Sequence, residues 1–258
     1  MKHLKNWDNK TWLSSSRYLS SLIKFLSQKI RFNNQTTILD IGCGRGKLIS
    51  ALSNKYHLKN LPIGIDIVKH KIRDKKIKFI NTSAVNYLKK TKLKFDLILF
   101  KQSIHFFKLT EIKTLILNTR RILNKNGKII ILSLDTKKND WPKFKSFKLK
   151  LSKSLKKDEK IISFIKSILK KFKISNFNFR VVLMKGVYIK MLNNRFTSCL
   201  LNLSAKDLSK GIQEINKVYG AKINFIDRLM CLEYKKNDSI FITFFYLIPS
   251  SYSDSNFE

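Results

Sequence analysis

The chain has 258 residues, of which 43% are hydrophobic and 12% aromatic. This composition excludes a fully disordered basic chain and suffices for one large domain, or for one domain with an insertion. Lys and Arg number 53 against 17 Asp and Glu, so the formal net charge is +36. Surfaces that bind polyanions usually use Arg, because its planar guanidinium binds phosphate through two hydrogen bonds. Only nine of these cations are Arg, so we favour compositional surface charge over a dedicated polyanion partner.

The three cysteines, Cys43, Cys199 and Cys231, are too few and too scattered for a disulfide framework or a zinc site, and no metal is expected. The first ten residues lack an apolar core, and the longest apolar run, residues 240–249, is too short to span a bilayer. These features predict a soluble, cytoplasmic protein without a transmembrane segment.

Apolar residues recur at helical spacing from Leu19 to Leu26, which predicts an amphipathic helix within residues 11–30. From residue 36 onward, short β-branched runs alternate with helical stretches near 47–56 and 109–123. This alternation predicts an α/β, Rossmann-like, doubly wound fold, in which a mostly parallel seven-stranded sheet has helices on both faces. The expected strands contain TTILDI, PIGIDI, IKFINT, FDLILF and GKIIILSL.

The alternation stops after residue 135. Residues 143–173 are rich in lysine and carry apolar residues at helical spacing, which predicts a basic amphipathic helix or helix pair before the sheet resumes near 177–183. The runs 223–234 and 240–247 are expected to pair as an antiparallel terminal hairpin. The expected segments are an N-terminal helical segment (1–35), a Rossmann-like core (36–135), a helical substrate lid with one core strand (136–220), a C-terminal β-hairpin (221–249) and a flexible tail (250–258).

The stretch ILDIGCGRG, residues 38–46, is a predicted strand that ends in Asp40 and is followed by three alternate glycines and a helix. Glycine is needed where the chain turns sharply and brings backbone N–H groups close to a ligand at a helix N-terminus. The spacing differs from that of NAD proteins and resembles the cofactor loop of class I S-adenosylmethionine (SAM) methyltransferases. The resemblance implies SAM as the cofactor, bound by Asp40, Gly42, Cys43, Gly44 and Gly46.

Asp66 ends the next predicted strand, where doubly wound folds place a carboxylate on the ribose hydroxyls. Its neighbour Ile67 is also expected to contact the cofactor. The third strand closes as FINTSA, where the family often carries an acidic residue on the adenine amino group. This sequence has Ser83 and Ala84 there. We expect the Ser83 hydroxyl to accept a hydrogen bond and the Ala84 N–H to meet the adenine ring.

The fourth strand continues as FDLILFKQSIHFF, which resembles the substrate-facing segment of small-molecule methyltransferases of type 11, including those similar to trans-aconitate methyltransferases. The resemblance implies that Lys101 and Gln102 lie beside the methionine portion of SAM and that Phe106 forms the pocket wall. His105 would face the acceptor, either as a general base or as a structural residue.

Methyl transfer from a sulfonium depends mainly on near-attack positioning, so the sequence need not contain a catalytic dyad. Two base-methylating classes are disfavoured, because the chain lacks both an Asn/Asp-Pro-Pro-aromatic box and a Pro-Cys pair. We therefore expect transfer to a small acceptor, and Lys101 with the lysine-rich insertion favours an anionic one. Tyr188 and Arg195 are further polar candidates for substrate contact.

Two alternatives stay open. The basic surface would suit an RNA methyltransferase, and the lysine-rich insertion could also lie on an anionic membrane. A SAM-binding or partner-binding module without catalysis is the third hypothesis.

Overall fold

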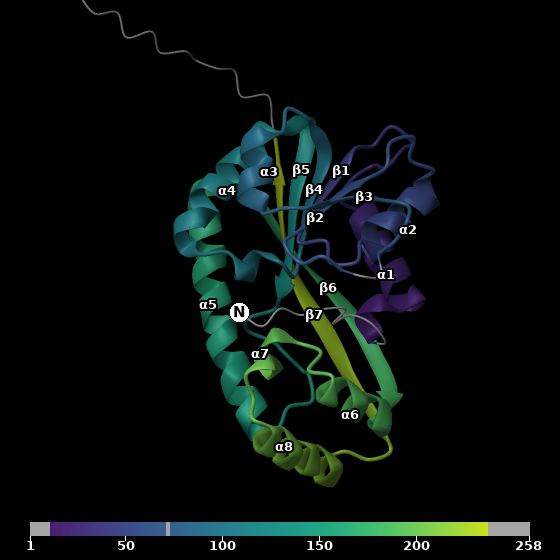
Figure 1. Ribbon diagram of the computed structural model, residues 1–258, viewed down its shortest axis with the longest axis vertical. Helices are drawn as coiled ribbons and strands as arrows, with labels where there is room; N and C mark the ends of the chain where they lie inside the picture. Colours follow the sequence, from purple (N-terminus) through teal and green to yellow (C-terminus); the bar gives the residue numbers. More distant parts are fainter. Residues whose placement is uncertain (1–10, 71–72, 237–258) are drawn as a thin grey trace, which may run out of the picture.

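A seven-stranded sheet in the order β3-β2-β1-β4-β5-β7-β6 runs through the protein (Figure 1). The computed structural model describes residues 11–70 and 73–236. Strands β1 to β5 are parallel, and β7 is antiparallel to both β5 and β6. The predicted Rossmann-like α/β fold is therefore confirmed. The strands are β1 (Ile38–Ile41), β2 (Ile63–Asp66), β3 (Lys78–Asn81), β4 (Phe95–Lys101), β5 (Leu123–Leu134), β6 (Lys173–Met184) and β7 (Lys222–Lys235).

Helices cover both faces of this sheet because alternate residues of the buried strands point to opposite sides. In β4, Leu97 and Leu99 join one apolar cluster with α1 and α2, whereas Ile98 and Phe100 join the other cluster with α3, α4 and the C-terminal part of α5. The helices are η1 (Trp12–Ser14), α1 (Ser16–Ser27), α2 (Lys47–Tyr56), α3 (Ala84–Lys90), η2 (Ile104–Phe106), α4 (Leu109–Arg121), α5 (Lys145–Leu169), α6 (Lys185–Asn193), α7 (Ser198–Leu201) and α8 (Ala205–Val218).

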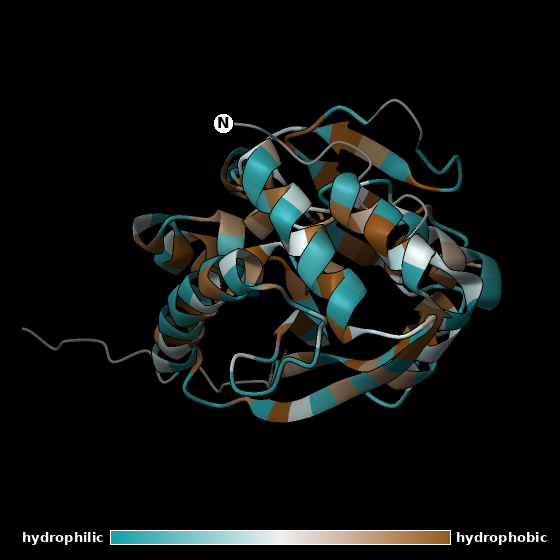
Figure 2. Ribbon diagram, turned by 90° about the horizontal axis from the view of Figure 1, so that it is seen from below, coloured by the Kyte–Doolittle hydropathy of each residue, from teal (hydrophilic) through white to brown (hydrophobic). Residues whose placement is uncertain are grey.

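The long helices are amphipathic, and Figure 2 shows hydrophilic and hydrophobic residues mixed along each of them. The lysine-rich insertion forms one helix, α5, which runs along the molecule from α8 to α4 (Figure 1). No helix within residues 11–70 and 73–236 is long and apolar enough to cross a membrane.

Strand β7 lies between β5 and β6, so residues 229–233 have a strand on each side. Its partners are therefore β5 and β6, whereas the predicted hairpin paired it with residues 240–247, which lie outside the described part of the chain. The chain segment from α6 to α8 connects β6 to β7 at the end of the sheet away from α3 (Figure 1). The division into five segments stays a prediction.

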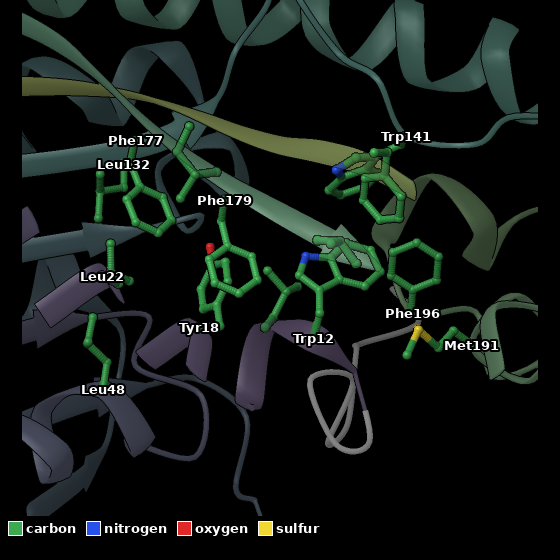
Figure 3. Close-up of a cluster of buried hydrophobic side chains, with 14 of the residues drawn as sticks. Trp12, Tyr18, Leu22, Leu48, Leu132, Trp141, Phe177, Phe179, Met191 and Phe196 are labelled. Carbon is green, nitrogen blue, oxygen red and sulfur yellow. The ribbon is translucent and has the colours of Figure 1, made fainter. Parts of the chain in front are cut away.

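An aromatic cluster joins η1 to the chain segment from α6 to α8 (Figure 3). Trp12 of η1 makes edge contacts with Trp141, Phe196 and Phe225, at centroid distances of 5.5, 5.2 and 5.2 Å. Such edge-to-face pairs stabilise a core beyond the burial of their area. The turn η1 is therefore packed against β7, the segment before α5 and the loop between α6 and α7.

Candidate functional site

The glycine loop follows β1 at the carboxyl end of the parallel strands. Gly42, Gly44 and Gly46 all have positive φ angles, of 76°, 56° and 74°. A Cβ atom on Gly42 would overlap the Cβ of Ser103, and one on Gly46 would overlap the side chain of Ile77, whereas one on Gly44 would meet nothing within 4 Å. Two glycines are thus required by packing, and the middle one borders open space where a ligand can approach the backbone.

Asp66 holds this loop against the end of β2. Its Oδ2 accepts a hydrogen bond from the Gly44 N–H and its Oδ1 one from the Val68 N–H, both at 2.8 Å. Each carboxylate oxygen has a second lone pair, so the group can still accept hydrogen bonds from two ribose hydroxyls. Ile67 follows with a side chain that is 61% exposed, and Cys43 lies in the loop with a thiol whose pKa burial raises.

Asp40 lies at the bottom of the site and is only 3% exposed. Burial raises the pKa of its carboxyl to about 7, with Lys101 opposing and Asp66 adding to the shift. Among the described residues its buried Oδ1 has no hydrogen-bond partner. A buried carboxylate oxygen without a partner suits a cationic ligand, and SAM carries both an ammonium and a sulfonium group. The residues present therefore fit this cofactor.

Lys101 is the last residue of β4, and Gln102 follows it; both lie near Asp40. The Lys101 ammonium lies 5.7 Å from the centroid of the Tyr18 ring, and its charge lowers the pKa values of Asp40 and Asp227. The positive charge of Lys101 thus favours the ionised form of two buried carboxyls. Gln102 has a φ of 53°, a strained value that is typical of functional sites, and its buried Nε2 has no partner within the described part of the chain.

His105 lies on η2, three residues after Gln102 in the sequence. Burial, and then the charge of Lys157, lowers the pKa of its imidazole to about 4, so the ring is neutral at physiological pH. The ring centroids of His105 and Phe106 are 4.1 Å apart, and Phe106 is 58% exposed. A neutral imidazole can accept a proton, but the same burial that lowers its pKa to about 4 makes it a weak base.

Ser83 and Ala84 begin α3 after the third strand. The Ser83 hydroxyl caps this helix by accepting a hydrogen bond from the Asn86 N–H at 3.2 Å. Its proton and one lone pair remain for the adenine edge. The N–H of Ala84 is in the first turn of α3, where backbone donors have no acceptor within the helix.

Tyr188 and Arg195, predicted as substrate contacts, both have hydrogen-bond partners within the fold, and their contact with the substrate stays a prediction. Tyr188 is completely buried in the aromatic cluster, and its hydroxyl donates to the Pro142 carbonyl at 2.7 Å. Arg195 donates through Nη1 to the Leu200 carbonyl at the end of α7 and lines a separate pocket of about 350 Å³ together with residues of α8. Their polar groups therefore serve packing and helix capping.

Sequence reasoning missed Asp227, which is fully buried in the aromatic cluster. Its Oδ1 accepts from the Trp141 indole at 2.9 Å and its Oδ2 from the Trp12 indole at 3.2 Å (Figure 3 shows both indoles). The signal was present in the strand, because Asp227 takes an inward position among alternating apolar residues of 223–231. Within the described ranges, no group of three or more His, Cys, Asp or Glu could hold a metal ion.

Comparison with protein families assigns the class. Residues 32–161, half of the chain, match a family model described as a methyltransferase domain, and the chain belongs to this family. A search of curated proteins found no match.

Solved structures share the fold at low sequence identity. One, described as a methyltransferase from an antibiotic biosynthesis pathway of Anabaena variabilis ATCC 29413, is 16% identical with a TM-score of 0.58, over 81% of this chain and 95% of that chain. Another, described as a methyltransferase of Bacillus halodurans C-125, is 12% identical with a TM-score of 0.50, over 84% and 99%. A phosphoethanolamine N-methyltransferase 2 of Haemonchus contortus, in complex with phosphomonomethylethanolamine and S-adenosylhomocysteine, is 12% identical with a TM-score of 0.50, over 92% and 61%.

The family match, the shared fold and the glycine loop agree on the activity. The protein is a class I SAM-dependent methyltransferase, with SAM as its cofactor.

Proposed function

We propose that this enzyme transfers the methyl group of SAM to a small-molecule acceptor that binds between η2 and the lid helices. The observation that carries the proposal is that Asp40, Gln102 and His105 lie at the carboxyl ends of the neighbouring parallel strands β1 and β4. Bound SAM supplies a methyl group whose transfer to a nucleophile breaks the methyl–sulfur bond and leaves S-adenosylhomocysteine.

The side chains of the site have separate tasks in this proposal. Asp40 binds the cationic end of the cofactor, and Asp66 binds its ribose. Gln102, with its unpartnered buried amide nitrogen, orients the methionine portion. His105 takes up the proton that the attacking acceptor loses; because burial lowers the pKa of its imidazole to about 4, it is a weak base and needs an acceptor that gives up its proton readily. Holding donor and acceptor in line can itself supply about 7–11 kcal/mol of the barrier in the best-oriented systems.

A narrower form of this proposal is that the acceptor carries a negative charge. The charge of Lys101 acts on the buried carboxyls of Asp40 and Asp227, so Lys101 is less suited to an acceptor carboxylate. The remaining support is Lys157 of α5, which is exposed and whose Nζ reaches the His105 carbonyl at 3.3 Å. A negative group on the acceptor would lie beside Lys157.

An RNA acceptor is the second candidate, favoured by the exposed lysine face of α5. The test incubates the protein with methyl-labelled SAM and a cell extract, and then separates small molecules from RNA. Label in the small-molecule fraction supports the proposal. Label in RNA, with binding that weakens steeply with salt, would replace it by the RNA activity. Binding of SAM without any labelled product would instead favour a non-catalytic module.

A further inference from the structure

The buried stripe of α5 contains one residue that breaks its apolar pattern. Asp158 is 5% exposed, although it lies in the same stripe as Leu151, Ile161, Ile162 and Ile165. A helix normally fills such a stripe with apolar side chains. In a chain with 53 cations and only 17 acids, an acid at this position calls for a physical reason.

The burial of Asp158 is not offset by a hydrogen bond to its Oδ1 within the described residues. Its Oδ1 is buried and has no hydrogen-bond partner anywhere in residues 11–70 and 73–236. Burial raises the pKa of the carboxyl to about 6, and the neighbouring Lys157 opposes the shift. A buried polar group without a partner lowers the stability of the fold. Asp227, by contrast, has both oxygens bonded to indoles.

The position of Asp158 places it on the acceptor side of the site. Helix α5 packs against both η2 and α7 (Figure 1 shows α7 beside the inner side of α5). Lys157, the adjacent residue, donates to the His105 carbonyl of η2 at 3.3 Å. On the other side, the charge of Asp158 acts on the thiol of Cys199 in α7. The carboxyl therefore lies on the buried face of α5, the helix that packs against both η2 and α7.

The groups around this carboxyl also suit a small molecule with an apolar body. Phe106 presents a ring that is 58% exposed, next to His105. Lys157 and Cys199 are the charged or titratable groups that act on Asp158, and neither donates a hydrogen bond to its Oδ1. The hydrogen-bonding capacity of the carboxylate is thus left for a ligand.

We propose that Asp158 is the acceptor-recognition residue of this enzyme and that its carboxylate accepts a hydrogen bond from a hydroxyl or amine group of the acceptor. The inference rests on the proposed small-molecule function and names the chemical class of the acceptor: an apolar body with a hydrogen-bond donor. A site built to accept from such a donor rejects analogues that lack it, because the buried carboxylate is then left unpaired.

The test measures binding of three probes of equal shape, benzylamine, benzyl alcohol and benzoate, to the full chain saturated with S-adenosylhomocysteine. Wild type is compared with Asp158→Asn, Asp158→Leu and the matched control Glu159→Gln, which removes a negative charge from the exposed neighbouring position. Wild type should bind the amine or the alcohol at least about tenfold more tightly than benzoate. Asp158→Leu should lose this preference, Asp158→Asn, which keeps an acceptor oxygen but no charge, should weaken it, and Glu159→Gln should keep it.

Thermal unfolding separates recognition from a structural role. Asp158→Leu should melt at a higher temperature than wild type, because an unpaired buried carboxyl is replaced by an apolar side chain of the same stripe. A wild type without preference for the donor probes would overturn the inference, as would a preference that persists in Asp158→Leu.

Failure of the proposed function gives a different result. In that case, wild type would show the probe preference but would transfer no label from SAM to small molecules. The reverse result, with label transferred but no probe preference, would leave the proposed function intact and remove the role of Asp158.

Discussion

The indole N–H of Trp12 donates to Oδ2 of Asp227 at 3.2 Å, which joins the beginning of the described chain to its last strand. The other carboxylate oxygen accepts from Trp141, so one buried acid ties together η1, the segment after β5, and β7. The two indole rings are 5.5 Å apart in an edge-to-face arrangement. This junction lies next to Lys101, and it therefore links the packing of the aromatic cluster to the floor of the cofactor site.

Asp227→Ala should be strongly destabilising. The substitution leaves two buried indole N–H groups unpaired, and breaking a buried polar network of this kind costs about 3–5 kcal/mol. Trp141→Phe, which removes one donor but keeps the carboxylate, should cost less. Urea unfolding monitored by tryptophan fluorescence and circular dichroism measures both. Equal stability of wild type and Asp227→Ala would show that the junction contributes nothing.

The glycine loop gives a matched pair of variants. Gly44→Ala should fold with a loss of about 1–2 kcal/mol from backbone strain at positive φ, but its methyl group occupies the ligand side of the loop and should lower SAM affinity at least tenfold. Gly42→Ala meets Ser103 as well, so its loss of stability should be larger. Calorimetric SAM titration and thermal unfolding test the pair. Unchanged affinity in Gly44→Ala would place the cofactor elsewhere.

The affinity for SAM should increase from pH 6 to pH 8. The raised pKa of Asp40, about 7, means that the free protein must lose a proton from this carboxyl before it can bind a cation. Asp40→Asn should bind SAM weakly and without this dependence. Titration calorimetry at both pH values, in buffers of different ionisation enthalpy, also detects the released proton. A flat profile in the wild type would exclude Asp40 as the cationic end's partner.

The same carboxyl affects folding of the cofactor-free protein. Between pH 4 and pH 7 the folded state keeps a proton on Asp40 that the unfolded state has already lost. The contribution of Asp40 to stability therefore falls as the pH rises through this window. Asp40→Asn should show a smaller decline of melting temperature from pH 4 to pH 7 than wild type.

His105→Ala should reduce turnover about a hundredfold or more while SAM affinity stays unchanged. Because the pKa of His105 is about 4, its imidazole stays neutral from pH 5 to pH 8, and this group should cause no fall of turnover near pH 6.5. The label-transfer assay measures both effects, and His105→Gln serves as a control that retains a hydrogen-bonding side chain. Full activity of His105→Ala would make His105 structural.

Local sequence patterns were sufficient for the core of the fold. The glycine spacing after Asp40 and the β-branched runs predicted β1 to β5, and α2 begins and ends where expected, at Lys47 and Tyr56. These features depend on residues that are neighbours in the chain. For the same reason the glycine loop and the end of β2 were placed together by the strand–loop–helix pattern alone.

Contacts between distant residues were beyond the sequence. Trp12 and Asp227 are 215 residues apart, and no local periodicity indicates that they meet. Tyr188 was expected at the substrate because it is polar, but its hydroxyl found an acceptor in Pro142 within the core. The unpaired state of Asp158 is likewise visible only when every neighbouring donor has been placed.

The place of β7 between β5 and β6 has a consequence for synthesis on the ribosome. The central strands can pair early, but β6 has no neighbour in the sheet until residues 222–235 have been made. Trp12 then has to wait for Asp227, so the first described helical turn docks after almost all of the described chain has emerged. Until that moment the indole N–H of Trp12 lacks the acceptor that it has in the folded protein, so this junction is among the last contacts to form during synthesis.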